Sequence, residues 1–183
     1  MRLFIGIPLD AAVVAELGAV ADRLKPQSEG LRWSAPAGWH ITLQFLGATT
    51  PGQYTCVRDG LSQIHCATFA IQLEPPGFFD RAGVFFAGVR LTPELTGLQQ
   101  RVLAATRPCG FIPEDRPYHP HITLARDNSR GRALRQLKSR VPGDARFSSF
   151  VAREFLLYES FPGPGGSRYE VRERFLMREP GLI

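Results

Sequence analysis

The chain has 183 residues, of which 44% are hydrophobic and 21% charged, and it carries 22 Lys and Arg against 17 Asp and Glu. This length is enough to bury a core, so we expect one domain over residues 1–183. No run of about 18 apolar residues occurs, which excludes a membrane-spanning helix and favours a cytoplasmic protein. The apolar start at residues 2–8 alternates like a strand and lacks the cleavage site of a signal peptide.

The cysteines Cys56, Cys66 and Cys109 are an odd set without CxxC spacing. This pattern argues against a disulfide framework and against a structural zinc site. Reduced thiols are typical of cytosolic proteins. We therefore expect three free thiols, and the sequence assigns them no role.

Capping residues and hydrophobic periodicity predict mixed strands and helices in the first part of the chain. Asp10 caps a helix rich in Ala, Val and Leu, and Thr50 and Thr92, each followed by proline, open two more. The expected helices are residues 11–24, 50–64 and 92–103. The expected strands are residues 2–8, 31–34, 39–46, 69–74 and 84–91, the last two separated by a loop at Pro75, Pro76 and Gly77.

The remainder of the chain repeats this mixture. We expect a loop at residues 109–120, a strand at 121–125, a basic helix at 131–140 and strands at 146–152, 154–160 and 168–177, with a Pro/Gly loop at 161–166. No linker of disordered composition divides the chain. Several connections are short enough for hairpins, which favours an α+β fold with antiparallel sheet.

The tetrapeptide His-Ile-Thr-Leu occurs at residues 40–43 and again at 121–124, and its copies contain two of the four histidines. Side chains alternate between the faces of a strand, so His40 and Thr42 share one face, as do His121 and Thr123. The Ile and Leu of each copy point to the opposite face and anchor it. The repeat suggests a bilobal molecule, in which two pseudo-symmetric lobes of antiparallel sheet with flanking helices face each other across a central cleft.

Two histidines on facing walls predict acid–base chemistry. Histidine titrates near neutrality, so a neutral His can take a proton from water while a protonated one gives a proton to a departing oxygen. This suits in-line attack on a phosphodiester, with Thr42 and Thr123 donating hydrogen bonds to the phosphate oxygens. No metal is required. The structural alternative is a pair of buried, hydrogen-bonded histidines beside two β-favouring threonines.

His119 raises a metal-dependent alternative, because with His40 and His121 it would complete a three-histidine site. Pro120 and the lack of a carboxylate in either motif argue against it. His65 is expected to be structural or merely exposed.

Phe45 and Arg126 each lie five residues after a motif histidine. An aromatic ring could stack on a base and an arginine could clamp a phosphate. Strict alternation puts both on the face opposite the histidines, so each needs a bulge or a strand end to reach the cleft. Alternation therefore favours a core position for Phe45.

The densest basic stretch favours a polyanionic partner, since guanidinium groups pair with phosphate. A solvated helix face explains it equally well. The stretch comprises Arg126, Arg130, Arg132, Arg135, Lys138 and Arg140.

The paired motifs and their flanks resemble the two-histidine (2H) phosphoesterase superfamily, and within it the RNA 2′,3′-cyclic phosphodiesterases, also called 2′-5′ RNA ligases. The likeness lies in residues 2–7, 39–47 and 120–126 and in the terminal segments 158–160 and 169–171. The resemblance implies a bilobal α+β fold and metal-free hydrolysis of an RNA 2′,3′-cyclic phosphate to a 2′-phosphate, without a cofactor. It implies that His40 is the proton donor and His121 the proton acceptor. It further implies that Thr42, Thr123 and Arg126 bind the phosphate.

Two other functions stay open. A 2′-5′ RNA ligase or phosphodiesterase would use the same histidines, although the high concentration of water favours hydrolysis. A non-catalytic RNA-binding module is the alternative from another class, and it would not need a matched acid and base. The expected partners are RNA ends with a 2′,3′-cyclic phosphate, and we expect a monomer that does not bind membranes.

Overall fold

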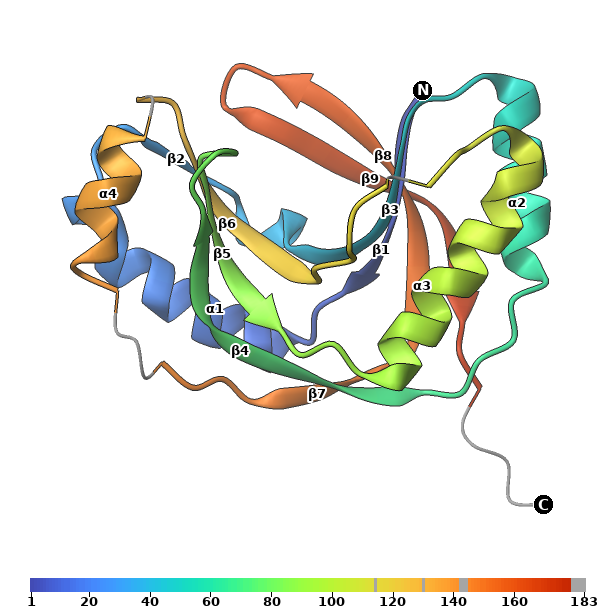
Figure 1. Ribbon diagram of the computed structural model, residues 1–183, viewed down its shortest axis with the longest axis horizontal. Helices are drawn as coiled ribbons and strands as arrows, with labels where there is room; N and C mark the ends of the chain where they lie inside the picture. Colours follow the sequence, from blue (N-terminus) through green and yellow to red (C-terminus); the bar gives the residue numbers. More distant parts are fainter. Residues whose placement is uncertain (114, 130, 142–144, 179–183) are drawn as a thin grey trace.

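The computed structural model describes residues 1–113, 115–129, 131–141 and 145–178. Two curled antiparallel sheets face each other, with four α-helices around them in the described part of the chain (Figure 1). The first sheet has the order β3 (His40–Ala48), β1 (Arg2–Pro8), β8 (Glu154–Gly163) and β9 (Gly166–Leu176). The second has the order β2 (Leu31–Trp33), β6 (His121–Asp127), β5 (Val84–Val89), β4 (Phe69–Phe79) and β7 (Ser149–Ala152). The helices are α1 (Ala11–Leu24), α2 (Pro51–Ser62), α3 (Pro93–Thr106) and α4 (Arg132–Lys138).

The α+β class and the antiparallel sheets confirm the prediction from the sequence. The two lobes are not the two halves of the chain, however. The first sheet combines the N-terminal strands β1 and β3 with the C-terminal strands β8 and β9. The short strand β2 lies between β1 and β3 in sequence but joins the second sheet. The chain therefore crosses repeatedly between the lobes, and each motif strand sits in its own sheet.

The three predicted helix starts are confirmed by their caps. The Asp10 carboxylate accepts a hydrogen bond from the Ala12 N–H at 2.8 Å. Thr50 and Gln53 form a reciprocal capping box at the start of α2, and Thr92 accepts from the Leu95 N–H at 3.2 Å at the start of α3. Each cap satisfies a backbone donor that has no partner within its helix. No helix in the described part of the chain is long and apolar enough to cross a membrane.

Two predicted loops are wrong, because the chain continues as strand through them. β4 runs through Pro75, Pro76 and Gly77 with a register shift at this point, and β7 pairs only with the earlier residues Phe69–Gln72. Proline is tolerated there because a bulge on an unpaired edge needs no ladder donor from it. Likewise β8 and β9 continue through the predicted loop at 161–166 and turn tightly, with Gly163 opposite Gly166.

The expectation of three free thiols is also wrong, because Cys56 and Cys109 form a disulfide. Cys56 lies in α2 and Cys109 ends the short 3-10 helix Arg107–Cys109 that follows α3. Their separation of 53 residues gives no sequence signal; α2 and α3 pack side by side and bring the two sulfurs together. Cys66 remains a free, half-buried thiol.

The main core is one hydrophobic cluster with members from both sheets and all four helices. A second, smaller cluster of Phe4, Leu156 and Tyr158, with Tyr169 packed against it, lies on the other face of the first sheet. The Phe4 and Tyr158 rings stack at 4.8 Å. The ring of His40, the histidine of the first motif, packs against this small aromatic cluster.

Candidate active site

The two motif strands are neighbours in space. β3 forms the edge of the first sheet, and it faces β6 of the second sheet across the centre of the molecule (Figure 1). The Tyr118 hydroxyl, just before β6, donates a hydrogen bond to the Thr42 carbonyl at 2.9 Å. Burial raises the pKa of Tyr118, so the hydroxyl keeps its proton for this bond. The fold thus brings together the two tetrapeptides that the sequence singled out.

A β-bulge interrupts the first motif strand directly after its threonine. Gly6 of β1 lies opposite Thr42, but the preceding residue, Ile5, lies opposite Gln44, so Leu43 is extra. Leu43 and Gln44 are consecutive buried residues, which strict alternation would not allow. The side-chain oxygen Oε1 of Gln44 accepts a hydrogen bond from the Thr106 hydroxyl at 2.7 Å, which gives this inward-turned oxygen a partner.

The second motif strand carries the same bulge at the same place. Phe86 of β5 lies opposite Thr123, and Phe85 lies opposite Ala125, so Leu124 is the extra residue. Leu124 and Ala125 are again consecutive and buried. The pseudo-symmetry of the two motifs therefore extends from their sequence to their backbone irregularity.

The two bulges return the fifth residue after each histidine to the histidine face of its strand. Phe45 has 59% of its surface exposed, and Arg126 is also exposed. The core interpretation of Phe45 is therefore wrong, since its ring lies 6.1 Å from Phe4, whose own ring contacts His40 at 4.5 Å. The bulge that these two residues needed is present in both strands.

His40 is held by its backbone and by the small aromatic cluster. Its Nδ1 lies 2.7 Å from the Gly38 carbonyl oxygen, and its Nε2 lies 3.1 Å from the Thr42 hydroxyl oxygen. A carbonyl oxygen can only accept, so Nδ1 carries the proton and Nε2 of the neutral ring is the basic nitrogen. The His40 ring contacts three aromatic side chains. The ring centroids of Phe4, Tyr158 and Tyr169 lie 4.5, 5.6 and 5.3 Å from that of His40.

His121 is held in the same way in the other lobe. Its Nδ1 lies 2.8 Å from the carbonyl oxygen of His119, again two residues earlier, so its basic nitrogen is also Nε2. Phe79 and Phe86 contact the ring with centroids 4.9 and 5.4 Å away. Both motifs thus fix the same tautomer by the same local bond and support the ring with aromatic side chains.

Both histidines are kept neutral by their surroundings. Burial lowers the pKa of His40 to about 4; the hydrogen bond to Gly38 opposes this decrease, and the charge on His121 adds to it. Burial also lowers the pKa of His121, again opposed by its backbone hydrogen bond to His119. The two imidazoles are close enough to disfavour a charge on both, which is the condition for one acid and one base.

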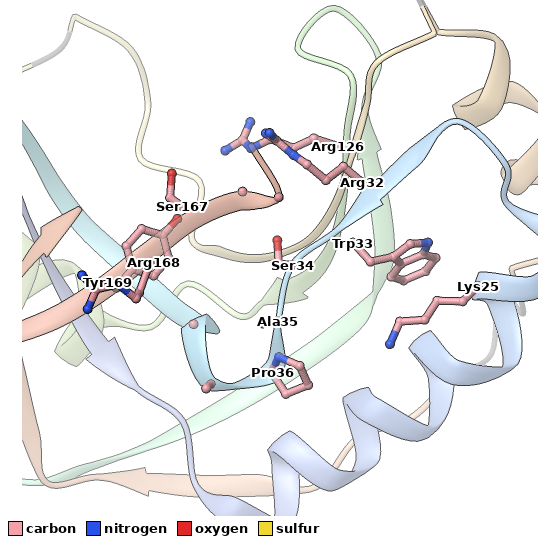
Figure 2. Close-up of a pocket in the computed structure, with 14 residues that line it drawn as sticks. Lys25, Arg32, Trp33, Ser34, Ala35, Pro36, Arg126, Ser167, Arg168 and Tyr169 are labelled. Atoms are coloured by element: carbon pink, nitrogen blue, oxygen red, sulfur yellow. The ribbon is translucent and has the colours of Figure 1, made fainter. Parts of the chain in front are cut away.

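A pocket of about 440 Å³, whose lining residues Figure 2 shows, shares part of its wall with the surroundings of His40. Arg126 lines it, and so do Gly38, whose carbonyl holds His40, and Tyr169, whose ring contacts His40. Three more basic side chains, Lys25, Arg32 and Arg168, share its wall. The pocket is therefore a basic extension of the site, although neither motif histidine lines it.

The remaining candidates from the sequence are His65, the basic stretch and His119, which shares its aromatic neighbours with His121. His119 contacts Phe79 and Phe86 edge-on, and the described residues contain no group of three His, Cys, Asp or Glu side chains that could hold a metal ion. His65 is exposed. In the basic stretch, Lys138 pairs with Asp80 at 2.6 Å and Arg140 donates to the Gln27 carbonyl at 2.5 Å, while Arg130 lies outside the described residues.

Sequence reasoning counted the segments of Phe4, Tyr158 and Tyr169 towards the family resemblance, but it assigned none of these residues, nor Arg32, to the site. Phe4, Tyr158 and Tyr169 come from β1, β8 and β9, and Arg32 comes from β2. None of them lies near a motif in the sequence. They lie near the motifs in space because of the order of the strands in the two sheets. The alternation of β1 could have placed Phe4 on the face of Gly6, but only the register against β3 places it below His40.

Comparison with known proteins identifies the family of this chain. The family model described as the 2′-5′ RNA ligase superfamily matches residues 10–159. The RNA 2′,3′-cyclic phosphodiesterase of Escherichia coli (strain K12) is 28% identical over 179 residues, which are 97% of this chain and 97% of that protein. The protein of the same name from Thermus thermophilus is 30% identical and covers 97% of this chain and 91% of its own length.

Solved structures show the same fold. The crystal structure of E. coli LigT in its apo form superposes with a TM-score of 0.81 at 27% identity, covering 97% of this chain and 98% of that one. The MHV ns2 PDE domain, at 15% identity and a TM-score of 0.58, shares the fold alone. Because the family model spans both motifs and most of the two sheets, the chain belongs to the 2′-5′ RNA ligase superfamily.

Proposed function

We propose that this protein is an RNA 2′,3′-cyclic phosphodiesterase that hydrolyses a terminal 2′,3′-cyclic phosphate to a 2′-phosphate. One observation carries the proposal: two histidines on facing strands, each with Nδ1 bonded to the carbonyl two residues earlier, so that each presents Nε2 for proton transfer. The whole-length relatives named RNA 2′,3′-cyclic phosphodiesterase support the substrate. The E. coli LigT structures with phosphate and with 3′-AMP support a site for a nucleotide phosphate.

In this proposal His121 is the base and His40 the acid. Nε2 of His121 takes a proton from a water molecule whose oxygen attacks phosphorus, and the bond from phosphorus to the 3′ oxygen breaks. Nε2 of His40 gives its proton to that departing oxygen, which leaves a 3′ hydroxyl and a 2′-phosphate. Thr42 and Thr123 donate hydrogen bonds to the non-bridging oxygens, and Arg126 offsets their negative charge.

The acid needs a proton that the free site does not hold at neutral pH. With a pKa of about 4, His40 is neutral before substrate binds. A bound phosphate next to Nε2 favours the imidazolium and raises this pKa. We therefore propose that substrate binding brings a proton with it, and that phosphate binds more tightly as the pH falls from about 7 to about 5.

A 2′-5′ RNA ligase remains the second candidate, because a 5′ hydroxyl could attack the same phosphorus with the same two histidines. The high concentration of water favours hydrolysis, and the named relatives are phosphodiesterases, so hydrolysis is the main proposal. RNA ends are the proposed partners. A monomeric state and a cytoplasmic location stay predictions.

The test uses purified protein in EDTA with a short RNA that ends in a 2′,3′-cyclic phosphate. We expect metal-free conversion to the 2′-phosphate, with at least a hundredfold loss of kcat in His40→Ala and His121→Ala. His65→Ala replaces an exposed histidine and is the matched control, with unchanged activity.

Three results would contradict parts of the proposal. Full activity of His40→Ala would end the two-histidine mechanism. A 3′-phosphate product would reverse which oxygen departs. Activity that is absent in EDTA and restored by zinc would favour the metal site built on His119, and salt-dependent RNA binding without turnover would favour the binding module.

A further inference from the structure

Arg32 and Arg126 form a like-charged pair in the pocket beside the histidines. They are Cα partners on the antiparallel strands β2 and β6, and both are exposed. Figure 2 shows their guanidinium groups next to each other, directed towards the side of the pocket where Ser167 lies. Like charges directly opposite in a sheet are destabilising, by up to about 1 kcal/mol. The pair therefore concentrates positive charge on this side of the pocket.

No carboxylate in the described part of the chain neutralises this pair. The nearest in sequence is Asp127, and its oxygens accept hydrogen bonds from the Ser129 N–H and hydroxyl and from the Leu134 N–H. These bonds tie Asp127 to the start of α4 and lower its pKa, so its charge is used on the far side of the strand from Arg126.

The other two basic side chains of the pocket are already paired. Lys25 contacts Asp22 at 2.9 Å, and Arg168 forms an ion pair with Glu170 while its guanidinium lies over the Phe161 ring. Arg32 and Arg126 therefore supply the unbalanced charge, and Arg168 adds donors from the β9 wall of the same pocket.

The position of the pocket indicates which group this charge meets. Gly38 and Tyr169 belong both to the pocket wall and to the surroundings of His40, so the pocket begins where the reacting phosphate would sit. A nucleotide that ends in a 2′,3′-cyclic phosphate has no 3′ neighbour. The only further phosphate within reach is the one attached to its own 5′ oxygen.

We propose that Arg32 and Arg168 form a second phosphate subsite, which shares Arg126 with the site of the reacting phosphate and binds the phosphate on the 5′ oxygen of the terminal nucleotide. Guanidinium groups match phosphate oxygens with paired N–H donors, and one phosphate relieves the repulsion between Arg32 and Arg126. The inference rests on the proposed function and narrows its substrate: an oligonucleotide end or a 5′-phosphorylated nucleotide is preferred to a bare nucleoside cyclic phosphate.

The experiment compares three substrates: adenosine 2′,3′-cyclic phosphate, the same compound with a 5′-phosphate, and the dinucleotide ApA with a 2′,3′-cyclic phosphate. We expect kcat/KM to be about tenfold higher for the two compounds that carry a second phosphate, the effect of one charge-assisted hydrogen bond. Arg32→Gln should bring both ratios close to one. Arg107→Gln, at an exposed arginine after α3, is the matched control and should keep the wild-type ratios.

The dinucleotide and the 5′-phosphate separate the possible sources of the preference. An advantage of both that depends on Arg32 supports a subsite for phosphate as such, and an advantage of the dinucleotide alone that depends on Arg32 supports one for the internal diester. A preference for the dinucleotide that survives Arg32→Gln would assign it to stacking of the extra base and would overturn the proposal. Equal kcat/KM on all three substrates in the wild type would also overturn it.

Binding without turnover keeps the subsite testable if the proposed function fails. Calorimetry would compare adenosine 2′-phosphate with the same compound carrying a 5′-phosphate. The subsite predicts about tenfold tighter binding of the second compound, lost in Arg32→Gln and retained in Arg107→Gln. Equal affinities in the wild type would contradict the subsite, whatever the enzyme does to cyclic phosphates.

Discussion

The imidazole of His40 is enclosed by Phe4, Tyr158 and Tyr169, and this enclosure links the candidate active site to the stability of the fold. In the unfolded chain a histidine takes up its proton near pH 6.5, whereas in the folded protein His40 does so at about pH 4. Between these values the unfolded state binds more protons than the folded state. The free energy of unfolding therefore falls as the pH is lowered through this window.

We expect His40 to cost the wild type roughly 2 kcal/mol of stability between about pH 7 and about pH 5. Urea unfolding at the two pH values measures this difference. In His40→Gln the difference should shrink by about that amount, because glutamine does not titrate. An equal pH dependence in both proteins would show that His40 is not held neutral.

Gly6 has no side chain, and this leaves space for the His40 ring. A Cβ added at Gly6 would lie 2.9 Å from the Ile41 carbonyl oxygen and 3.3 Å from Cδ2 of His40. The first contact is with backbone, which cannot move aside without shifting the motif strand.

We expect Gly6→Ala to lower kcat/KM by about tenfold to a hundredfold through displacement of His40, while the fold persists. Cyclic phosphate hydrolysis measures the loss, and circular dichroism checks the fold. Gly18→Ala is the control, because nothing lies within 4 Å of its added Cβ and its site is inside α1; this variant should keep its activity. Wild-type activity in Gly6→Ala would show that the close approach does not position the histidine.

At the scale of elements, the sequence predicts helices and strands where local signals suffice. The caps at Asp10, Thr50 and Thr92 are local, and the helices begin there. The strand through Pro75 and Pro76 was missed, because whether a proline interrupts a strand depends on what pairs with its edge, and β7 ends before it reaches them. The placement of a bulge depends likewise on the partner strand.

The disulfide between α2 and the end of α3 is the other feature that local signals did not predict. It closes a loop of 53 residues, so it restricts the unfolded chain considerably. We expect Cys56→Ser, or reduction of the wild type, to lower the free energy of unfolding by about 2–4 kcal/mol in urea. Cys66→Ser, which removes the free thiol, should respond to reductant as the wild type does. No change on reduction would mean that the two thiols are not joined in solution.

At the scale of the whole molecule, the lobes are joined close to the motifs. Tyr118 crosses from the segment before β6 to the Thr42 carbonyl of β3. The repeat in the sequence predicted that the two motifs face each other, but not this tie, since no pattern marks Tyr118. The position of Arg32 opposite Arg126 was equally hidden, because it depends on β2 joining the sheet of the other lobe.

We expect Tyr118→Phe to lower the free energy of unfolding by about 1–2 kcal/mol, since the Thr42 carbonyl loses its donor. The same variant should also raise KM, because Thr42, which binds a phosphate oxygen in the proposed mechanism, would be held less firmly. Urea unfolding and steady-state kinetics measure the two effects. A wild-type KM combined with lower stability would confine Tyr118 to a structural role.

The paired bulges determine the spacing that the functional residues of each motif have in the sequence. In an unbroken strand only even offsets share a face, so a histidine, a threonine two residues later and a third functional side chain five residues later cannot all face one substrate. One inserted residue changes odd into even, and the structure contains that insertion directly after the threonine of each motif. An odd offset between functional residues of an otherwise alternating motif thus indicates a bulge in the backbone of that strand. Deleting Leu124 would remove the bulge and shorten the offset from His121 to four, so Arg126 would keep the histidine face on a regular strand.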